Sequence, residues 1–456
     1  MLLLTKKNDP ALYPYRQGLY FAFFNAMNWQ VATATPTVLF MAHLGADSFQ
    51  TGLVYGWPLL LTPVQVLATV LLPRMGFKKL TLAGWGARSW FILVPLLLAV
   101  LAPPHAPPWM ILAMVAAMFC YSLSRSVGAA AITTWLQGLV PETVRGRYWS
   151  TDQIMGGTAS VATLLLCAAT FTWLPASIAF AVQYAFSISG AWLAFRCLRT
   201  LPDIERPTVM SLATIRTETP RHLFGAGLFR PYLWLAVLFF IVTTPIVPFA
   251  AYYLKVEAGV PSALIMGCTI VQYGGVILGT WFMRPRLDRT GARPFFRLAF
   301  ILYALVAVGW LAALHWRPAM LWLLPALYFL LGAGSGIFTA ANVSYLAKIV
   351  PVAERALPVS LHGALTFFTG GLAPMAWGLV LKGGGAVPSV NPVAFQVFFG
   401  CTLIGALVLV ALAQRLKETP GHADPLLEGD WLFRPFRVVA SLVKLREPNP
   451  PPGGQR

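Results

Sequence analysis

The stretch PYLWLAVLFFIVTTPIVPFAAYYL, residues 231–254, contains no Asp, Glu, Lys or Arg. A helix needs about 20 apolar residues to cross the hydrocarbon core of a bilayer. Because backbone groups in lipid must find their hydrogen bonds within the segment, a stretch of this length and polarity predicts a membrane-spanning helix.

The rest of the chain has the same character. Of its 456 residues, 58% are hydrophobic and only 11% are charged, and the mean hydropathy is +0.69. Soluble domains are about a quarter charged. This composition disfavours a disordered protein, a disulfide-rich secreted domain and a nucleic-acid-binding protein, and it favours a protein that uses lipid as solvent.

Uncharged stretches of similar length recur along the chain, and two longer ones are expected to fold back at Pro103–Pro108 and Trp173–Pro175. The sequence therefore predicts an all-α polytopic membrane protein with about 12 transmembrane helices. The predicted spans are residues 17–43, 51–73, 81–102, 109–136, 151–172, 176–195, 231–254, 261–283, 297–315, 319–347, 357–381 and 392–414. Two prolines three residues apart, Pro245 and Pro248, predict a broken helix in the seventh span.

The distribution of positive charge fixes the predicted orientation. If the N-terminus is cytoplasmic, 29 of the 33 Lys and Arg residues face the cytoplasm, and only Lys255, Arg317 and Lys382 face outward. This asymmetry is the positive-inside pattern of membrane proteins. The net charge of +18 is thus explained by topology, and no nucleic-acid partner is expected.

The predicted spans fall into two six-helix halves, residues 17–195 and 231–414, which follow a cytoplasmic N-terminus at 1–16. Residues 196–230 form a polar, proline-containing linker between the halves. Leu136, Pro141 and Arg145 recur 210 residues later as Leu346, Pro351 and Arg355. Such internal repeats are characteristic of secondary transporters.

The tail, residues 415–456, contains a predicted amphipathic helix at about 431–446. Its basic face predicts binding to anionic lipids of the inner leaflet. Packing of this helix on the protein's own loops is the alternative.

Two predicted loops carry recognisable motifs. Residues 284–293 read RPRLDRTGAR, with the Asp288–Arg289 pair followed by Gly291 and a basic residue, and residues 140–148 read VPETVRGRY. With twelve spans in two halves, these loops resemble the major facilitator superfamily of secondary transporters. Arg284 stands where the family has glycine, and the equivalent loop at 73–79 lacks the Asp–Arg pair.

The resemblance implies that spans 1, 4, 7 and 10 line a central cavity. The predicted substrate-binding residues are Asn25, Asn28, Gln65, Arg125, Thr244, Gln272 and Asn342. For the amides, a hydrogen bond between helices is the alternative role. The predicted gating residues are Arg145, Arg147, Asp288, Arg289 and Arg355, for which anchoring of the cytoplasmic loops is the alternative.

Arg125 lies near the middle of the fourth predicted span, too far from either end for its side chain to reach water. A charge in mid-membrane is costly and marks a functional site by default. The planar guanidinium suits a carboxylate or a phosphate. Arg125 is therefore expected to bind an anionic substrate, to hold backbone carbonyls or Asp152 in a structural role, or to take part in proton coupling.

Other ionisable residues give weaker signals. Arg88 lies about two turns into the third span, and we expect its side chain to snorkel to the interface. His362 lies near the inner end of its span, where we expect interfacial solvation. Asp152 and His362 are the coupling candidates, and exchange, facilitated diffusion and proton symport all stay open.

These patterns predict a secondary active or facilitative transporter of a small organic solute, with an anionic solute as the specific hypothesis. A drug or metabolite efflux carrier, and a non-transporting receptor or assembly factor on the same scaffold, are the alternatives. An enzyme is disfavoured because the histidines are isolated, and no cofactor or metal is expected. The expected setting is a monomer in a bacterial inner membrane, with both termini cytoplasmic.

Overall fold

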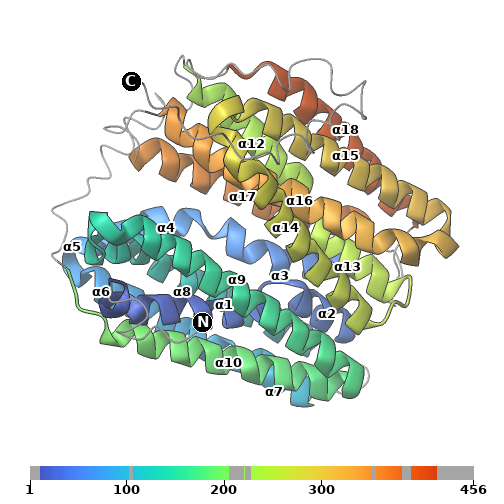
Figure 1. Ribbon diagram of the computed structural model, residues 1–456. Helices are drawn as coiled ribbons and strands as arrows, with labels where there is room; N and C mark the ends of the chain where they lie inside the picture. The colour runs from blue at the N-terminus through green and yellow to red at the C-terminus, as the bar shows by residue number, and fades with distance from the viewer. Residues whose placement is uncertain are drawn as a thin grey trace, which may run out of the picture.

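The computed structural model describes residues 11–101, 106–204, 220, 227–350, 356–382 and 392–417, and this part of the chain is built from helices (Figure 1). The predicted helix at 431–446, Arg355 and most of the predicted linker lie outside the described residues. The α-helices are α1 (Arg16–Ala32), α2 (Thr35–His43), α3 (Ser48–Leu60), α4 (Pro63–Ala68), α5 (Leu72–Met75), α6 (Phe77–Phe91), α7 (Leu93–Leu101), α8 (Pro108–Leu139), α9 (Glu142–Trp173), α10 (Ala176–Thr200), α12 (Phe229–Thr243), α13 (Ile246–Val256), α14 (Ser262–Thr290), α15 (Arg293–His315), α16 (Arg317–Ile349), α17 (Ala356–Leu381) and α18 (Pro392–Gln414), with 3-10 turns at Tyr13–Tyr15 and Thr69–Leu71.

Eleven helical segments in the described ranges are long and apolar enough to cross a membrane. The prediction of about twelve spans differs by one because the first span is divided into α1 and α2, of 17 and 9 residues. Neither piece alone reaches the length that a crossing needs. The eleven remaining segments confirm the predicted multi-pass α-helical fold.

The predicted fold-back points are also confirmed. α7 ends at Leu101 and α8 begins at Pro108, while α9 ends at Trp173 and α10 begins at Ala176. The proline pair breaks the seventh span between α12 and α13, as expected. The break between α1 and α2 falls at the equivalent place in the first half.

Local chemistry explains the break in the first span. Pro36 has no N–H, so the carbonyl of Ala32 loses its ordinary helical partner. The hydroxyl of Thr37 replaces it, because Oγ1 lies 3.0 Å from the Ala32 oxygen and 2.8 Å from the Val31 oxygen. The divided span is thereby held in a fixed shape.

The second and third spans are also divided, which the sequence analysis did not predict. α3 gives way to α4 at residues 61–62, just before Pro63, and α6 gives way to α7 at Ile92. The equivalent spans of the second half, α14 and α15, are continuous helices.

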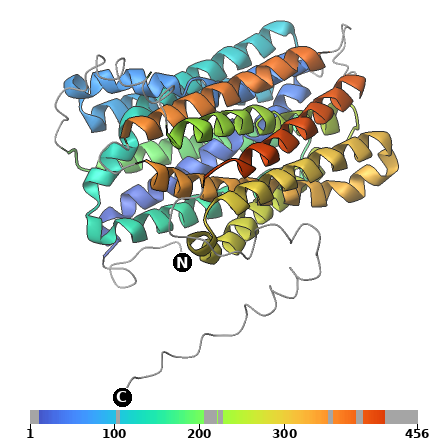
Figure 2. The same ribbon diagram turned by 90° about the horizontal axis from the view of Figure 1, so that it is seen from above.

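The two halves occupy separate parts of the molecule. Figure 1 shows most of α1 to α10 below and most of α12 to α18 above, with α13 reaching down beside the first half, and Figure 2 shows the long helices running roughly along one common direction. Between the halves, α3 packs against α17, α9 against α14, and α2 against α13.

Glycines permit the close approach of α3 to α17. A Cβ atom added at Gly52 would lie 2.3 Å from the carbonyl oxygen of Pro374, and one added at Gly56 would lie 2.5 Å from that of Gly371. Both distances are shorter than real side chains tolerate. The two backbones are therefore in direct contact, as at other small-residue helix interfaces.

Polar contacts close the same interface near the start of α3, and we call this the sealed end of the bundle. Asp47 pairs with Lys382 at 2.9 Å, and the Ser48 hydroxyl donates to the Gly378 carbonyl at 2.8 Å. Tyr252 adds a hydrogen bond from its hydroxyl to the carbonyl of Ala46 at 2.9 Å. The halves are thus joined at this end by side chains from both.

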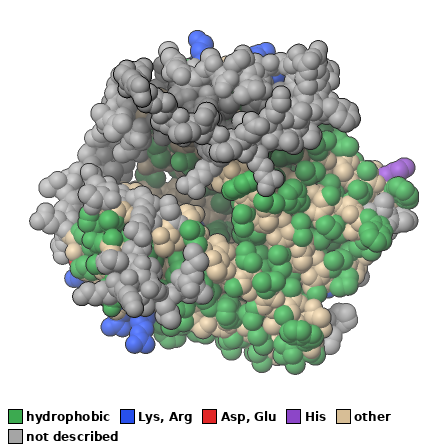
Figure 3. Space-filling model, viewed as in Figure 1, with side chains coloured by type: hydrophobic (Ala, Val, Ile, Leu, Met, Phe, Trp, Pro, Cys, Tyr) green, Lys and Arg blue, Asp and Glu red, His purple; other side chains and the backbone are tan. Residues whose placement is uncertain are grey.

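The surface agrees with a membrane setting. On the face seen in Figure 3, the described surface is mostly hydrophobic, and Lys and Arg side chains lie at its margins. The same view shows a hollow between the two halves. In Figure 1, that part of the bundle lies toward the side on which α6 begins, away from the sealed end.

Candidate functional site

Arg125 lies midway along α8 and reaches toward α1 and α3. Its guanidinium carbon lies 4.3 Å from the centre of the Trp29 ring, and Nη1 lies 3.5 Å from the carbonyl oxygen of Pro58. The residue is partly exposed, and among the described residues this long hydrogen bond is its one protein hydrogen bond. Most of its N–H donors therefore have no protein partner in the described part of the chain.

The Pro58 carbonyl is available because α3 ends there. The Thr62 amide, which would bond to Pro58 in a continuous helix, instead donates to the Leu59 oxygen at 3.0 Å. The Thr62 hydroxyl lies 3.4 Å from the Pro58 oxygen. A broken helix thus supplies a backbone acceptor in mid-membrane, as discontinuous helices do in many carriers.

Arg88 overturns the expectation of snorkelling, since its side chain is 0% exposed. Its Nη2 donates to Asn25 Oδ1 at 2.7 Å, and its guanidinium lies 4.7 Å from the Trp85 ring centre and 5.8 Å from that of Tyr121. The short distance of Arg88 from the end of its span predicted that the side chain would reach water. The face of α6 that carries Arg88 instead packs toward the protein interior.

Asn25 is therefore occupied by Arg88. Its Oδ1 also accepts a long hydrogen bond from the Trp85 indole at 3.4 Å. Arg88 and Arg125 lie close enough for their charges to interact. Among the described residues, neither forms an ion pair with a carboxylate, so together they create an uncompensated positive region in the first half.

Asn28 is fully buried and holds three helices together. Its Nδ2 lies 3.0 Å from Ser187 Oγ and 3.3 Å from the Ser187 carbonyl oxygen on α10, and its Oδ1 accepts from the hydroxyl of Tyr121 on α8. This is the interhelical alternative that the sequence analysis left open.

Replacing Asn28 with Ala is expected to lower the free energy of unfolding by about 1–3 kcal/mol, because Tyr121 and Ser187 would lose a buried partner. Thermal unfolding in detergent measures the loss, and Ser187→Ala, which removes one hydroxyl, should cost less. A protein of unchanged stability that no longer responds to ligand would instead assign Asn28 to the substrate.

The other predicted substrate-binding residues, three in the second half and Gln65 in the first, are spread over several helices. Thr244 caps α12 at the predicted break and is partly exposed, and Asn342 on α16 accepts a hydrogen bond from the Tyr232 hydroxyl. Gln272 on α14 has a buried Oε1 with no partner among the described residues. Gln65 lies on α4 and is partly exposed.

His362 corrects a second expectation. It is 5% exposed, and its ring stacks on Tyr232 with centroids 5.7 Å apart and an interplanar angle of 4°. Its Nε2 is buried and has no partner among the described residues. Aromatic packing, rather than interfacial water, surrounds this imidazole because α17 packs against α12 at this level.

The predicted gating residues stand on helices rather than in loops. Arg145 and Arg147 belong to the first turns of α9, and Asp288 and Arg289 to the last turn of α14. α9 and α14 pack together across the halves. Asp152 follows on α9 and is partly exposed.

Two residues at the centre were missed. Tyr273 on α14 donates from its hydroxyl to Oε1 of Gln30 on α1 at 2.7 Å, and Gln30 is 1% exposed. Each is adjacent in sequence to a residue already discussed, Gln272 or Trp29. The many polar residues of the first span indicate that it faces the protein interior. Gln30 and Tyr273 lie 243 residues apart, however, so only the fold shows that they pair.

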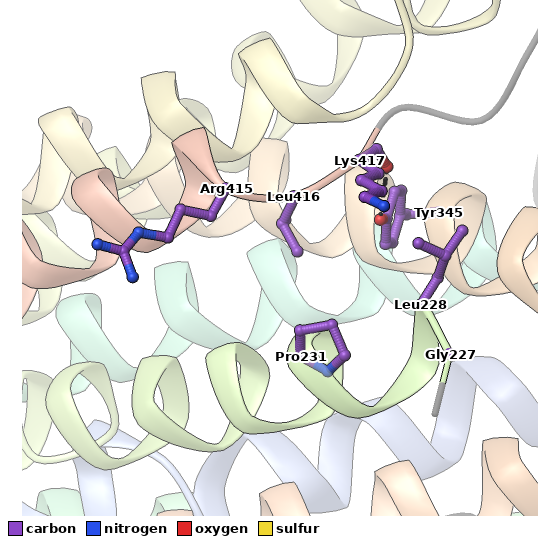
Figure 4. A pocket seen from close by; sticks show the side chains of 7 residues that line it. All are labelled: Gly227, Leu228, Pro231, Tyr345, Arg415, Leu416 and Lys417. Atoms are coloured by element: carbon purple, nitrogen blue, oxygen red, sulfur yellow. Dashed lines mark hydrogen bonds between the residues drawn. The ribbon is translucent and has the colours of Figure 1, made fainter. Parts of the chain in front are cut away.

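A pocket of about 290 Å³ lies where the start of α12 meets α16 and the residues that follow α18 (Figure 4). It is lined by Gly227, Leu228, Pro231, Tyr345, Arg415, Leu416 and Lys417, and the Tyr345 hydroxyl donates to the Lys417 carbonyl at 2.9 Å. It contains none of the predicted substrate-binding residues.

Comparisons with known proteins agree with this architecture. The family model described as Major Facilitator Superfamily matches residues 233–448. No curated protein sequence is significantly similar to the chain.

Several solved structures share the fold. The nucleoside transporter NupG is 16% identical with a TM-score of 0.64, covering 87% of this chain and 99% of that one. The inward-open xylose transporter XylE from E. coli is 14% identical with a TM-score of 0.65, covering 89% and 97%. The peptide transporter POT is 13% identical with a TM-score of 0.64, covering 88% and 95%. The second half of the chain thus matches the major facilitator superfamily in sequence, and the chain shares the fold of transporters of that architecture.

Proposed function

We propose that the protein moves a small organic anion across the membrane by alternating access, and that Arg125 binds the anionic group. The observation that carries this proposal is the state of Arg125: a mid-membrane guanidinium that is partly exposed and stacked on Trp29. Its one described protein hydrogen bond is long, and no described carboxylate pairs with it.

The chemistry favours a carboxylate or a phosphate. A planar guanidinium presents parallel N–H donors that fit two oxygens of such a group. Trp29 covers one face of the guanidinium, so its edge is left for a ligand. Arg88 adds positive potential from a buried position, which is felt more strongly in a low-dielectric interior. An anion in this region would offset both charges.

The proposed gate lies at the end opposite the sealed end. Arg145 and Arg147 stand at the positive end of the α9 dipole, and Asp288 stands at the negative end of the α14 dipole. A positive charge near the start of a helix and a negative charge near its end both interact unfavourably with the helix dipole. Pairing across the two helix ends would relieve both when this side closes, and we assign Arg289 and Arg355 to the same gate.

The surroundings follow the sequence expectations. We place both termini in the cytoplasm of a bacterial inner membrane, with a monomer whose tail contacts anionic lipids. Asp152 and His362 stay the coupling candidates, in a secondary active or facilitative carrier. A drug or metabolite efflux carrier is a second candidate function, since Trp29, which is partly exposed beside Arg125, would also accept an aromatic solute.

Ligand-induced thermal stabilisation of the purified protein in detergent tests the proposal. The panel contains carboxylates, phosphate esters, sugars, amino acids and hydrophobic cations. We expect anions to raise the melting temperature of the wild type and the rise to vanish in a folded Arg125→Gln protein. Arg199→Gln, at an exposed arginine on the last turn of α10, is the matched control and should respond like the wild type.

Two results would contradict the proposal. One is a wild type that responds only to neutral or cationic solutes. The other is an Arg125→Gln protein that still responds fully to anions, which would leave Arg125 a structural or coupling role. A non-transporting receptor would bind a solute in this assay but fail to accumulate it in liposomes.

A further inference from the structure

The hydrogen bonds between the two halves form a series that runs from the sealed end toward the membrane centre. It begins with the bonds of Ser48 to Gly378 and of Tyr252 to Ala46, described above. It continues with Thr269 on α14 and Thr35 on α2, whose hydroxyl oxygens lie 3.3 Å apart. Gln30 and Tyr273 follow at 2.7 Å. Within the described residues, this pair is the innermost hydrogen bond between the halves.

The position of the pair is mechanically significant. Tyr273 lies one helical turn from Thr269 on α14, and Gln30 lies one turn before the break between α1 and α2. Of the contacts outward from the break, Thr35 belongs to α2 and Ala46 and Ser48 lie beyond it, whereas Gln30 belongs to α1. This one bond therefore ties the inner segment of the divided span to the second half.

The pair also adjoins the candidate substrate site. Gln30 follows Trp29 directly in the sequence, and the Arg125 guanidinium lies over the Trp29 ring. The Gln30 Nε2 is buried and has no partner among the described residues. The amide nitrogen of glutamine carries two N–H donors, and burying them without partners costs free energy, so a rearrangement that offers Gln30 an acceptor offsets part of the cost of breaking this bond.

We propose that the Gln30–Tyr273 hydrogen bond is a latch that holds the sealed end closed, and that its release is required before the halves separate there. It makes Gln30 and Tyr273 positioning residues, which act through the placement of α1 against α14. The proposal rests on the proposed function only in that opening of this end is a step of transport.

Tyr273→Phe removes the latch hydroxyl and keeps the ring. Tyr184→Phe is the matched control, because the Tyr184 hydroxyl lies 3.1 Å from Thr37 Oγ1, also buried, but both residues belong to the first half. Gln30→Met removes the same latch from the other side. Backbone hydrogen exchange of each protein is measured in lipid nanodiscs without added ligand.

We expect Tyr273→Phe and Gln30→Met to raise exchange in residues 46–60 and 370–382 by about twofold to tenfold, which corresponds to the loss of one hydrogen bond. Tyr184→Phe should leave these segments unchanged, even if it lowers the melting temperature. Because no ligand is present, failure of the anion assay would not affect this result.

Two outcomes would overturn the proposal. One is unchanged exchange at the sealed end in both latch variants. The other is an equal rise in Tyr184→Phe, which would show a general loosening of buried tyrosines. If one latch variant does not fold, the other decides the question, since each removes the same bond.

Discussion

Replacing Gly56 with Val is expected to force the sealed end open. The new Cβ would lie 2.5 Å from the Gly371 carbonyl oxygen. The α3 backbone fixes the position of the Cβ, and the oxygen belongs to the α17 backbone, so neither can turn aside. Overpacking of this kind costs about 1–3 kcal/mol. A state in which α3 and α17 separate escapes this cost, so the population shifts toward it. The reactivity of a cysteine introduced at Ser48, which is 2% exposed, reports the shift.

Gly400→Val provides the matched control. Gly400 lies within α18, as Gly56 lies within α3, and a Cβ atom added there meets nothing within 4 Å. Its effect on helix propensity is the same, but it leaves the interface intact. If Ser48→Cys reacts with a membrane-impermeant thiol reagent at the same rate in both backgrounds, contact between the α3 and α17 backbones does not set the conformation.

Replacing Arg88 with Ala is expected to cause the largest loss of stability of any change proposed for the first half. The side chain is fully buried between Trp85 and Tyr121, so its removal leaves a cavity. Truncation of large buried side chains costs about 3–5 kcal/mol. Asn25 would also lose its strongest donor. The melting temperature in detergent should fall clearly.

Arg88→Met separates the packing of this residue from its charge. Methionine fills most of the volume, and replacement of a buried charge by an apolar side chain is often neutral or stabilising. We therefore expect the melting temperature of Arg88→Met to stay near that of the wild type, with weaker stabilisation by anions. A methionine variant as unstable as the alanine variant would show that the charge itself supports the fold.

The helices and their ends were largely predictable from the sequence because they depend on local chemistry. Charge-free length sets the spans, and proline sets the breaks between α12 and α13 and before α8. The break after Leu60 was missed, although Pro63 was visible, because many transmembrane helices contain proline without a break. A proline removes one hydrogen bond, and the surrounding packing decides whether the helix continues.

The candidate site was predictable only in part. Arg125 stood out because mid-membrane charge is rare. Arg88 was misjudged, because distance from the end of a span does not reveal which face a helix turns inward. Asn25 and Asn28 were predicted to bind substrate, and the partners that the structure gives them, Arg88 and Ser187, lie far away in sequence. Side chains that could bind a substrate or a neighbouring helix look identical until the fold supplies the neighbour.

The helix breaks are distributed differently in the two halves, and this difference affects how each half can change shape. In the first half, the second and third spans are each jointed, whereas their counterparts α14 and α15 run without interruption. A span bends most easily where its backbone hydrogen bonds are interrupted, whereas a continuous helix resists bending. We therefore expect the first half to change shape within its own spans during transport, and the second half to move more nearly as a rigid body.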